Sequence, residues 1–158
     1  MKRVKLLLLL AFVALLGCDS EEVFDEIQQL TIDRKLIDDY LAENNISATE
    51  IGNTGIRYVI NTPGSGPNAQ FAESVFAHYT GYFLDGTEFD DSTESDPIDF
   101  VIGAGQVVQG WEIGFREFNK GTSATLFLPS KYGYGSNRRG NIPANSVLIF
   151  DVRVLDIR

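Results

Sequence analysis

The sequence predicts an α+β domain, in which an antiparallel sheet is covered by one short helix. From Gly55 onward, short stretches of β-branched and aromatic residues alternate with turn residues, which is typical of strands joined by tight connections. Between residues 107 and 118 the apolar spacing changes to that of a helix. The length of 158 residues fits one such domain with additional length at one end.

The predicted strands lie at residues 56–60, 74–84, 87–90, 98–102, 122–128 and 146–157. The second and third form a hairpin, because Asp85-Gly86 separates them and glycine adopts positive φ without steric cost. Residues 62–67 contain two prolines and two glycines and therefore predict a loop.

Two helices are predicted. The one at residues 107–118 has four apolar residues on one side, Val107, Trp111, Phe115 and Phe118. The other, at residues 31–45, has Thr31 as its N-cap, Asp33 in its first turn and Asn44-Asn45 as its stop. Its apolar stripe comprises Ile32, Leu36, Ile37, Tyr40 and Leu41. This stripe must be buried on the following domain or on a second copy of the chain, as a homodimer, and the sequence leaves both open.

The N-terminus has the pattern of a secretory signal. Lys2, Arg3 and Lys5 precede an apolar run that ends at Leu16, too short for a spanning helix of roughly 20 residues. Leu15-Leu16-Gly17-Cys18 resembles the lipobox of bacterial lipoproteins, in which the cysteine is lipidated and becomes the first residue of the mature chain. We therefore expect an exported protein, anchored by lipid on Cys18 to a bacterial membrane at its periplasmic face or at the cell surface. A plain signal peptide is the alternative.

These patterns divide the chain into four segments. Residues 1–17 are expected to be the lipoprotein signal peptide and residues 18–30 an acidic tether. Residues 31–50 form the N-terminal helical segment, and residues 51–158 form the folded domain.

Composition excludes several classes of function. Acidic residues outnumber basic ones by 22 to 13, and a net charge of −9 disfavours nucleic-acid binding. A single cysteine and a single histidine allow neither a disulfide framework nor a zinc cluster, and we expect no metal and no cofactor. His78 lies within a predicted strand and is expected to be structural. Asp90 and Asp91 would point to opposite faces of a strand, so they do not form a carboxylate pair.

Aromatic residues are the remaining unusual feature, with 11 Phe, 6 Tyr and 1 Trp. Their number alone fits either a core or a ligand pocket. Five blocks of sequence resemble, in order, the FK506-binding-protein (FKBP) type peptidyl-prolyl isomerases and span about 100 residues. They are Tyr79-Thr80-Gly81 with Asp85-Gly86-Thr87-x-Phe89-Asp90, Gly105-Gln106-Val107-Val108-x-Gly110-Trp111-Glu112-x-Gly114, Pro129-x-x-Tyr132-Gly133-Tyr134-Gly135, Ile142-Pro143 and Leu148-Ile149-Phe150-Asp151-Val152.

The resemblance implies an antiparallel half-barrel sheet wrapped around a short helix, with a prolyl-binding pocket between them. It implies that proline-containing polypeptides are substrates and that the enzyme assists the folding of exported proteins. The implied pocket residues are Tyr79, Phe89, Asp90, Val107, Val108, Trp111, Tyr132, Tyr134, Ile142 and Phe150. Trp111 would be the floor, and Tyr134 with the Val108 N–H would hold substrate carbonyls. Asp90 would organise hydrogen bonds at the rim.

Two departures from the family pattern leave an alternative open. Ile98 stands where many members have phenylalanine, and the loop at residues 136–141 carries Arg138-Arg139 and is about one residue shorter. They are the basis for the alternative of a binding module or chaperone lipoprotein with little catalytic turnover.

Overall fold

The computed structural model describes residues 18–92 and 96–158, so the predicted signal at residues 1–17 lies outside the described residues. The main sheet has the strand order β1-β2-β8-β9-β4-β5, and all its pairs are antiparallel. β6 also pairs with β4, along residues 74–77, whereas β5 pairs with residues 80–82. The strands are β1 (Thr49–Glu50), β2 (Arg57–Thr62), β4 (Ser74–Tyr82), β5 (Glu88–Asp91), β6 (Ile98–Val101), β8 (Ser123–Leu128) and β9 (Leu148–Ile157). The helices are α1 (Cys18–Glu43) and α2 (Gln109–Gly114), with 3-10 turns η1 (Phe115–Glu117) and η2 (Ser130–Tyr132).

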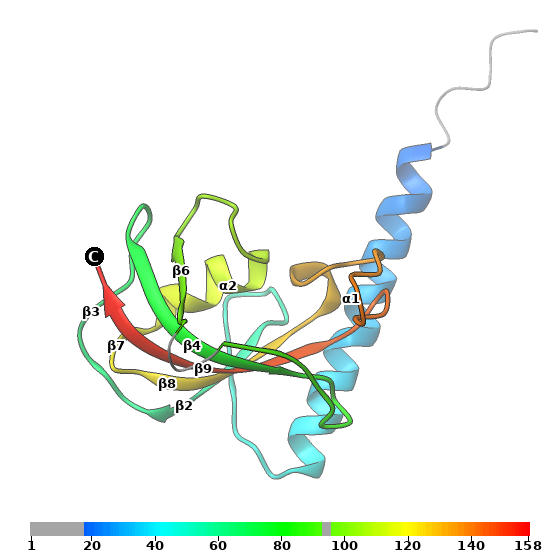
Figure 1. Cartoon of the computed structure of the whole chain (residues 1–158). Coiled ribbons are helices and arrows are strands. Elements are labelled where there is room, and N and C mark those ends of the chain that lie inside the picture. Colours follow the sequence, from blue (N-terminus) through cyan, green and yellow to red (C-terminus); the bar gives the residue numbers. More distant parts are fainter. Residues whose placement is uncertain (1–17, 93–95) are drawn as a thin grey trace, which may run out of the picture.

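The sheet curves around α2, which lies in its concave side (Figure 1). Inward-facing residues of β9 and β8 alternate with outward-facing ones, as a pleated strand requires. The inner face contributes Leu126, Leu128, Leu148, Phe150, Val152 and Val154 to the main core with Trp111, Phe115 and Phe118. The predicted fold class, an antiparallel sheet wrapped around a short helix after an N-terminal helix, is confirmed.

Two glycines let α2 approach the sheet closely. A Cβ built on Gly110 would lie 2.6 Å from Leu128 Cδ1, and one on Gly114 would lie 2.7 Å from Leu126 Cδ2. Both leucines are fully buried and have no room to move aside. The absence of a side chain at Gly110 and at Gly114 therefore allows the short distance between the helix and the sheet.

The prediction of a loop at residues 62–67 was wrong in part. Residues 65–68 form a short strand, β3 (Ser65–Asn68), paired with β7 (Asn119–Lys120). The pairing makes only two register partners, on a surface where all four β3 residues are exposed. Proline is tolerated on such an edge, because one side of the strand needs no ladder hydrogen bonds.

The N-terminal helix is longer than predicted. It already includes residues 18–30, so helix replaces the acidic tether expected there. Thr31 is not the N-cap, because it lies within the helix and its hydroxyl donates to the Ile27 carbonyl at 2.9 Å. Residues 18–43 contain no glycine or proline to interrupt a helix. The predicted stop is confirmed, since Asn45 has a φ of 54° and the Ile46 N–H donates to the Leu41 carbonyl.

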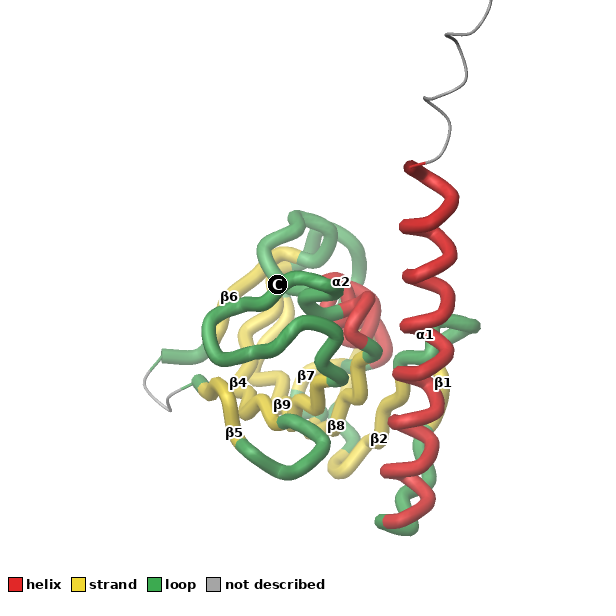
Figure 2. The backbone as a smooth tube through the Cα atoms, turned by 90° about the vertical axis from the view of Figure 1, so that its right-hand side faces the viewer, coloured by secondary structure: helices red, strands yellow, loops and turns green. Residues whose placement is uncertain are grey.

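The apolar stripe of α1 is partly buried on the outer face of the same sheet. Ile37 and Leu41 form a second cluster with Phe127, Val147 and Ile149. Ile32 and Leu36 remain exposed, at 52% and 43%. Both views show α1 running alongside the sheet, with its N-terminal end extending beyond the domain (Figures 1 and 2). No helix of the described residues has the length and apolar content needed to cross a bilayer.

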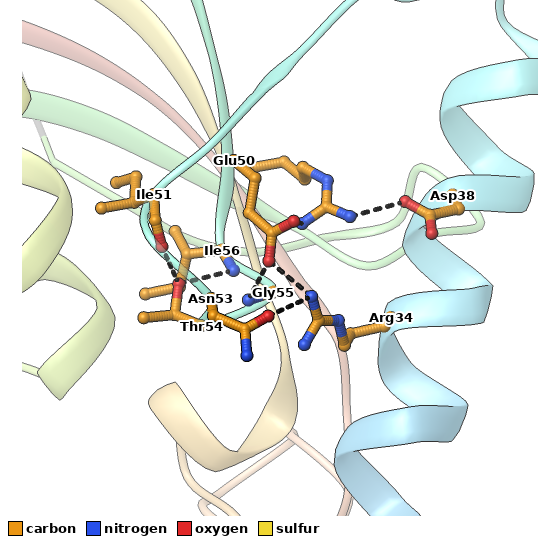
Figure 3. Close-up of polar contacts among 9 residues, drawn as sticks. Arg34, Asp38, Glu50, Ile51, Asn53, Thr54, Gly55 and Ile56 are labelled. Atoms are coloured by element: carbon orange, nitrogen blue, oxygen red, sulfur yellow. Dashed lines mark hydrogen bonds and ion pairs between the residues drawn. The ribbon is translucent and has the colours of Figure 1, made fainter.

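A polar clasp fixes the same helix to the β1–β2 region (Figure 3). Glu50 pairs with Arg34 of α1 at 2.6 Å and with Arg57 of β2 at 3.0 Å. Arg57 also pairs with Asp38 of α1 at 3.0 Å. The clasp and the apolar cluster together make α1 part of the folded unit rather than a free arm.

Substituting Ile37 tests this docking. Ile37→Ala is expected to lower the free energy of unfolding by about 2–4 kcal/mol, because it leaves a cavity between α1 and the sheet. Ile32→Ala, on the exposed side of the same helix, is the matched control and is expected to change it by less than about 0.5 kcal/mol. Urea unfolding measures both. Equal effects of the two substitutions would show that α1 does not dock as described.

Candidate active site

The floor of the candidate site is Trp111, which is 3% exposed at the start of α2. Its ring packs edge-on against Tyr79 and Phe150, with centroids 5.0 and 5.2 Å away. Phe100 and Phe115 pack on it from the core side at 5.7 and 5.1 Å. Rings from β4, β6, β9 and η1 therefore fix the indole in one orientation.

Gly81 makes room for the aromatic wall. It follows Tyr79 by two residues in β4 and so faces the same side of the sheet. A Cβ built there would lie 2.6 Å from Phe89 Cζ and 3.1 Å from Phe150 Cε1. Phe89 and Phe150 then meet edge to face with centroids 5.6 Å apart. The glycine in the Tyr79-Thr80-Gly81 block is thus explained by ring packing.

Asp90 and Tyr79 form the polar part of the rim. The Tyr79 hydroxyl donates to Asp90 Oδ2 at 2.8 Å, and the Asp91 N–H donates to Asp90 Oδ1 at 3.0 Å. Burial, and then the hydrogen bond to Asp90, raise the pKa of Tyr79 well above its ordinary value. A phenol is protonated at neutral pH in any case, and here it serves as a donor to the carboxylate.

The segment before α2 presents Val107 and Val108 to the site. Val108 is the N-cap of α2, with extended backbone, and its carbonyl accepts from the Trp111 N–H at 2.9 Å. The described residues provide no acceptor for the Val108 N–H. Glu112 holds the preceding loop, since its carboxylate accepts from the Gly103 N–H and, at 2.9 Å, from the Gly105 N–H.

The loops after β8 complete the rim. Tyr132 and Tyr134 are partly buried against the main core, and Ile142 is 5% exposed. The side chain of Asn141 donates to the Phe89 carbonyl at 3.3 Å, which ties this loop to β5. Arg139 lies over the Tyr134 ring, with its guanidinium carbon 6.0 Å from the centroid.

All ten residues of the implied pocket lie in or beside the main apolar cluster. Nine belong to the main apolar cluster or pack directly on it, and the tenth, Asp90, is bonded to Tyr79. Trp111, Ile142 and Phe150 are buried, whereas Tyr79, Phe89, Val107, Val108, Tyr132 and Tyr134 are only partly so. The arrangement is a buried apolar floor with a half-buried aromatic rim.

Sequence reasoning missed three residues that shape this site. Phe100 packs on Trp111. The one sequence signal for an inward-facing Phe100 was the alternation of residues in the predicted strand at 98–102. Glu112 bonds the loop amides, and the signal was an acidic residue in the first turn of a helix that follows two closely spaced glycines. Ser130 begins η2, two residues before Tyr132, and its role depends on a partner far away in sequence.

The Trp111 indole N–H has no hydrogen-bond partner among the described residues, although it is buried. An unpaired buried donor costs about 1–3 kcal/mol. Phenylalanine would fill much of the same space without that cost. A buried donor that is left unpaired in this way is typical of a residue that serves a function.

The single histidine and a groove on the outer face of the sheet lie outside the candidate site. Within residues 18–92 and 96–158, no three His, Cys, Asp or Glu side chains are grouped to hold a metal ion. His78 lies in β4 with Nδ1 3.2 Å from Ser92 Oγ. A groove of about 450 Å³ lies between α1 and the outer face of the sheet, lined by Tyr40, Val59, Phe127 and Ile149 among others. It is separated from Trp111 by the sheet itself.

Comparisons with known proteins agree with this geometry. A model of the family described as "FKBP-type peptidyl-prolyl cis-trans isomerase" matches residues 66–155. The chain is 38% identical over 125 residues to the FKBP-type peptidyl-prolyl cis-trans isomerase FkpA of Aeromonas hydrophila, covering 76% of this chain and 45% of that protein. It therefore spans less than half of that relative. It is 40% identical over 106 residues to Fkbp12 of Drosophila melanogaster, covering 65% of this chain and 98% of that protein.

A solved structure shows the same arrangement. The crystal structure of a peptidyl-prolyl cis-trans isomerase from Pseudomonas syringae superposes with a TM-score of 0.70 at 27% identity. The match covers 82% of this chain and 93% of that one. The family match covers more than half of the sequence and includes all ten residues of the implied pocket. This chain belongs to the family of FKBP-type peptidyl-prolyl cis-trans isomerases.

Proposed function

We propose that this chain is a peptidyl-prolyl cis–trans isomerase that accelerates rotation about X–Pro bonds in exported polypeptides and so assists their folding. The observation that carries the proposal is the buried Trp111 floor, enclosed edge-on by Tyr79 and Phe150. A flat apolar floor with aromatic walls fits a pyrrolidine ring. Family membership supports the same activity.

The chemistry needs no nucleophile. Rotation about an X–Pro bond takes tens to hundreds of seconds without a catalyst, because it breaks amide resonance across a barrier of about 18–20 kcal/mol. In the twisted transition state the nitrogen lone pair is no longer delocalised, so the carbonyl oxygen carries less negative charge. An apolar pocket favours this state over the more dipolar planar amide. Lowering the barrier by about 5–6 kcal/mol gives roughly 10⁴-fold acceleration.

Anchoring contacts would hold the chain on either side of the rotating bond. The Val108 N–H lacks an acceptor among the described residues and lies one turn before the floor, so it is suited to bind a substrate carbonyl. Tyr134 at the rim is the second anchor. Asp90 accepts from Tyr79 and from the Asp91 N–H, so it organises the rim rather than donating a proton.

A protease-coupled isomerisation assay tests the activity, using soluble protein that starts at Asp19 and a panel of X-Pro peptides. Phe150→Leu is expected to lower kcat/KM about tenfold or more, because it opens the wall beside Trp111. Phe127→Leu is the matched control. Phe127 is equally buried in the neighbouring strand but faces α1, so its loss affects stability and leaves kcat/KM within about twofold.

Two results would contradict this proposal. No acceleration by the folded wild-type protein would favour the alternative of a binding module, with Ile98 in place of a ring as the first suspect. Equal losses in Phe150→Leu and Phe127→Leu would place the activity somewhere other than this pocket.

We also propose that residues 1–17 are a signal peptide and that Cys18 is lipidated, which would anchor the protein at a bacterial membrane. The support is the sequence pattern before Cys18, with its basic start, short apolar run and Leu15-Leu16-Gly17-Cys18. From Cys18 to Glu26, α1 would hold the domain about 12 Å from the anchor. The proposed catalytic unit is residues 51–158. A homodimer through residues 31–45 stays a prediction that rests on the exposed Ile32 and Leu36.

Replacing the single cysteine tests the anchor. In a Gram-negative host the wild-type protein is expected in the membrane fraction, with a lipid mass on its N-terminal peptide. Cys18→Ser is expected to lack that mass and to leave the detergent phase, whereas Ser20→Ala keeps both properties. Fractionation and mass spectrometry of the N-terminal peptide give the readout. A wild-type peptide without lipid would contradict the proposal.

A further inference from the structure

Asp33 of α1 is a fully buried carboxylate, and the proposed chemistry does not use it. Its Oδ2 accepts from the Ser130 N–H at 2.8 Å and from the Ser130 hydroxyl at 2.6 Å. Its Oδ1 accepts from the Gln29 side-chain amide at 2.7 Å. A buried carboxylate is tolerated when its oxygens are bonded in this way, and its removal leaves donors unpaired. The contact joins residues 97 positions apart.

Ser130 begins η2, and its N–H has no cap from the preceding residue. That residue is Pro129, which makes no side-chain cap hydrogen bond. An N-cap side chain normally accepts the first free N–H groups of a helical turn. Asp33 performs this task from another helix. The start of η2 is therefore fixed by α1 and not by its own neighbours in sequence.

Ser130 also holds the segment that carries both rim tyrosines. Its carbonyl accepts from the Gly133 N–H at 2.9 Å and from the Gly135 N–H at 2.8 Å. Tyr132 and Tyr134 lie inside this set of bonds. With Asp33 on its N–H and hydroxyl and two amides on its carbonyl, every polar group of Ser130 is used.

The same segment touches the floor helix. A Cβ built on Gly110 would lie 3.0 Å from the Tyr132 carbonyl oxygen, so η2 packs directly on the residue before Trp111. The segment after β8, drawn in gold to orange in Figure 1, lies beside α1. A shift of Ser130 would therefore displace Tyr132 and Tyr134 and change the packing of the segment on Gly110, next to Trp111.

We propose that Asp33 is a positioning residue, which fixes Ser130 and through it the placement of Tyr132 and Tyr134 at the pocket rim. The inference rests on the proposed isomerase function for its effect on activity. The claim that Asp33 fixes the position of Ser130 and of the two tyrosines does not depend on that function. The alternative is that Asp33 only attaches α1 to the domain.

The test compares neighbouring residues of α1 in the full soluble chain starting at Asp19. Asp33→Ala removes the cap, and Asp33→Asn keeps an oxygen for both Ser130 donors. Arg34→Met breaks the pairs with Glu50 and Asn53, while its stem still packs near Gly55, so it weakens α1 docking without touching Ser130. Ser130→Ala loses only the hydroxyl bond and serves as a milder variant if Asp33→Ala does not fold.

Three readouts are measured for each variant. The isomerisation assay gives kcat/KM. The rate of hydrogen exchange at the Gly133 and Gly135 amides reports how firmly residues 130–135 are held. Emission of Trp111, the single tryptophan, reports the floor. Asp33→Ala is expected to lower kcat/KM about tenfold, to speed exchange at both amides about tenfold and to shift the emission. Ser130→Ala is expected to give smaller changes of the same kind, and Asp33→Asn to stay within about twofold of wild type.

The control separates positioning from attachment. Arg34→Met is expected to lower stability while all three readouts stay at the wild-type level. The proposal is overturned if Asp33→Ala matches Arg34→Met in these readouts at equal loss of stability, or if Ser130→Ala changes none of them. If the wild type proves inactive, the isomerase proposal fails, while amide exchange and Trp111 emission still decide the role of Asp33.

Discussion

The close approach of α2 to the sheet is the constraint on which the rest of the structure depends. Gly110 and Gly114 allow the helix to rest on Leu128 and Leu126, where any β-carbon would collide. Trp111 lies between the two glycines and is therefore pushed into the concave side, where rings from three strands hold it. A helix one methyl group farther from the sheet would leave the indole loose, and both core and site would lose their packing.

The sheet then separates two tasks by the alternation of its strands. On β9, Phe150 faces Trp111, whereas the adjacent Ile149 faces α1. On β8, Leu126 and Leu128 support the floor helix, whereas Phe127 packs on Tyr40 of α1 with centroids 5.9 Å apart. A one-residue slip of either strand would exchange the two faces. The register is consequently specified from both sides, by the aromatic cluster around Trp111 and by the docked helix.

Much of this was predictable from sequence, because strands and turns depend on neighbouring residues. The strand predicted at 74–84, observed as β4 (Ser74–Tyr82), and the Asp85-Gly86 turn follow from local chemistry. The ten pocket residues came from the resemblance of the five sequence blocks, and their role stays a prediction. What could not be predicted depends on distant partners. Asp33 was assigned to the first turn of a helix, where its charge would suit the dipole, yet it lies four residues before the buried Ile37 on the same face. Its partner Ser130 is 97 residues away, and no local pattern connects the two.

The helix α1 lies before the region that defines the family, which begins at residue 66. Fkbp12 of Drosophila melanogaster is matched over 98% of its length by 65% of this chain. A segment outside the family region nevertheless supplies a buried carboxylate to a turn inside it. Under the proposed anchoring, that same helix includes the lipidated residue, Cys18. One continuous helix would then join the anchor to the pocket rim. The same helix would set the orientation of the domain at the membrane and, through Asp33, the position of the rim segment.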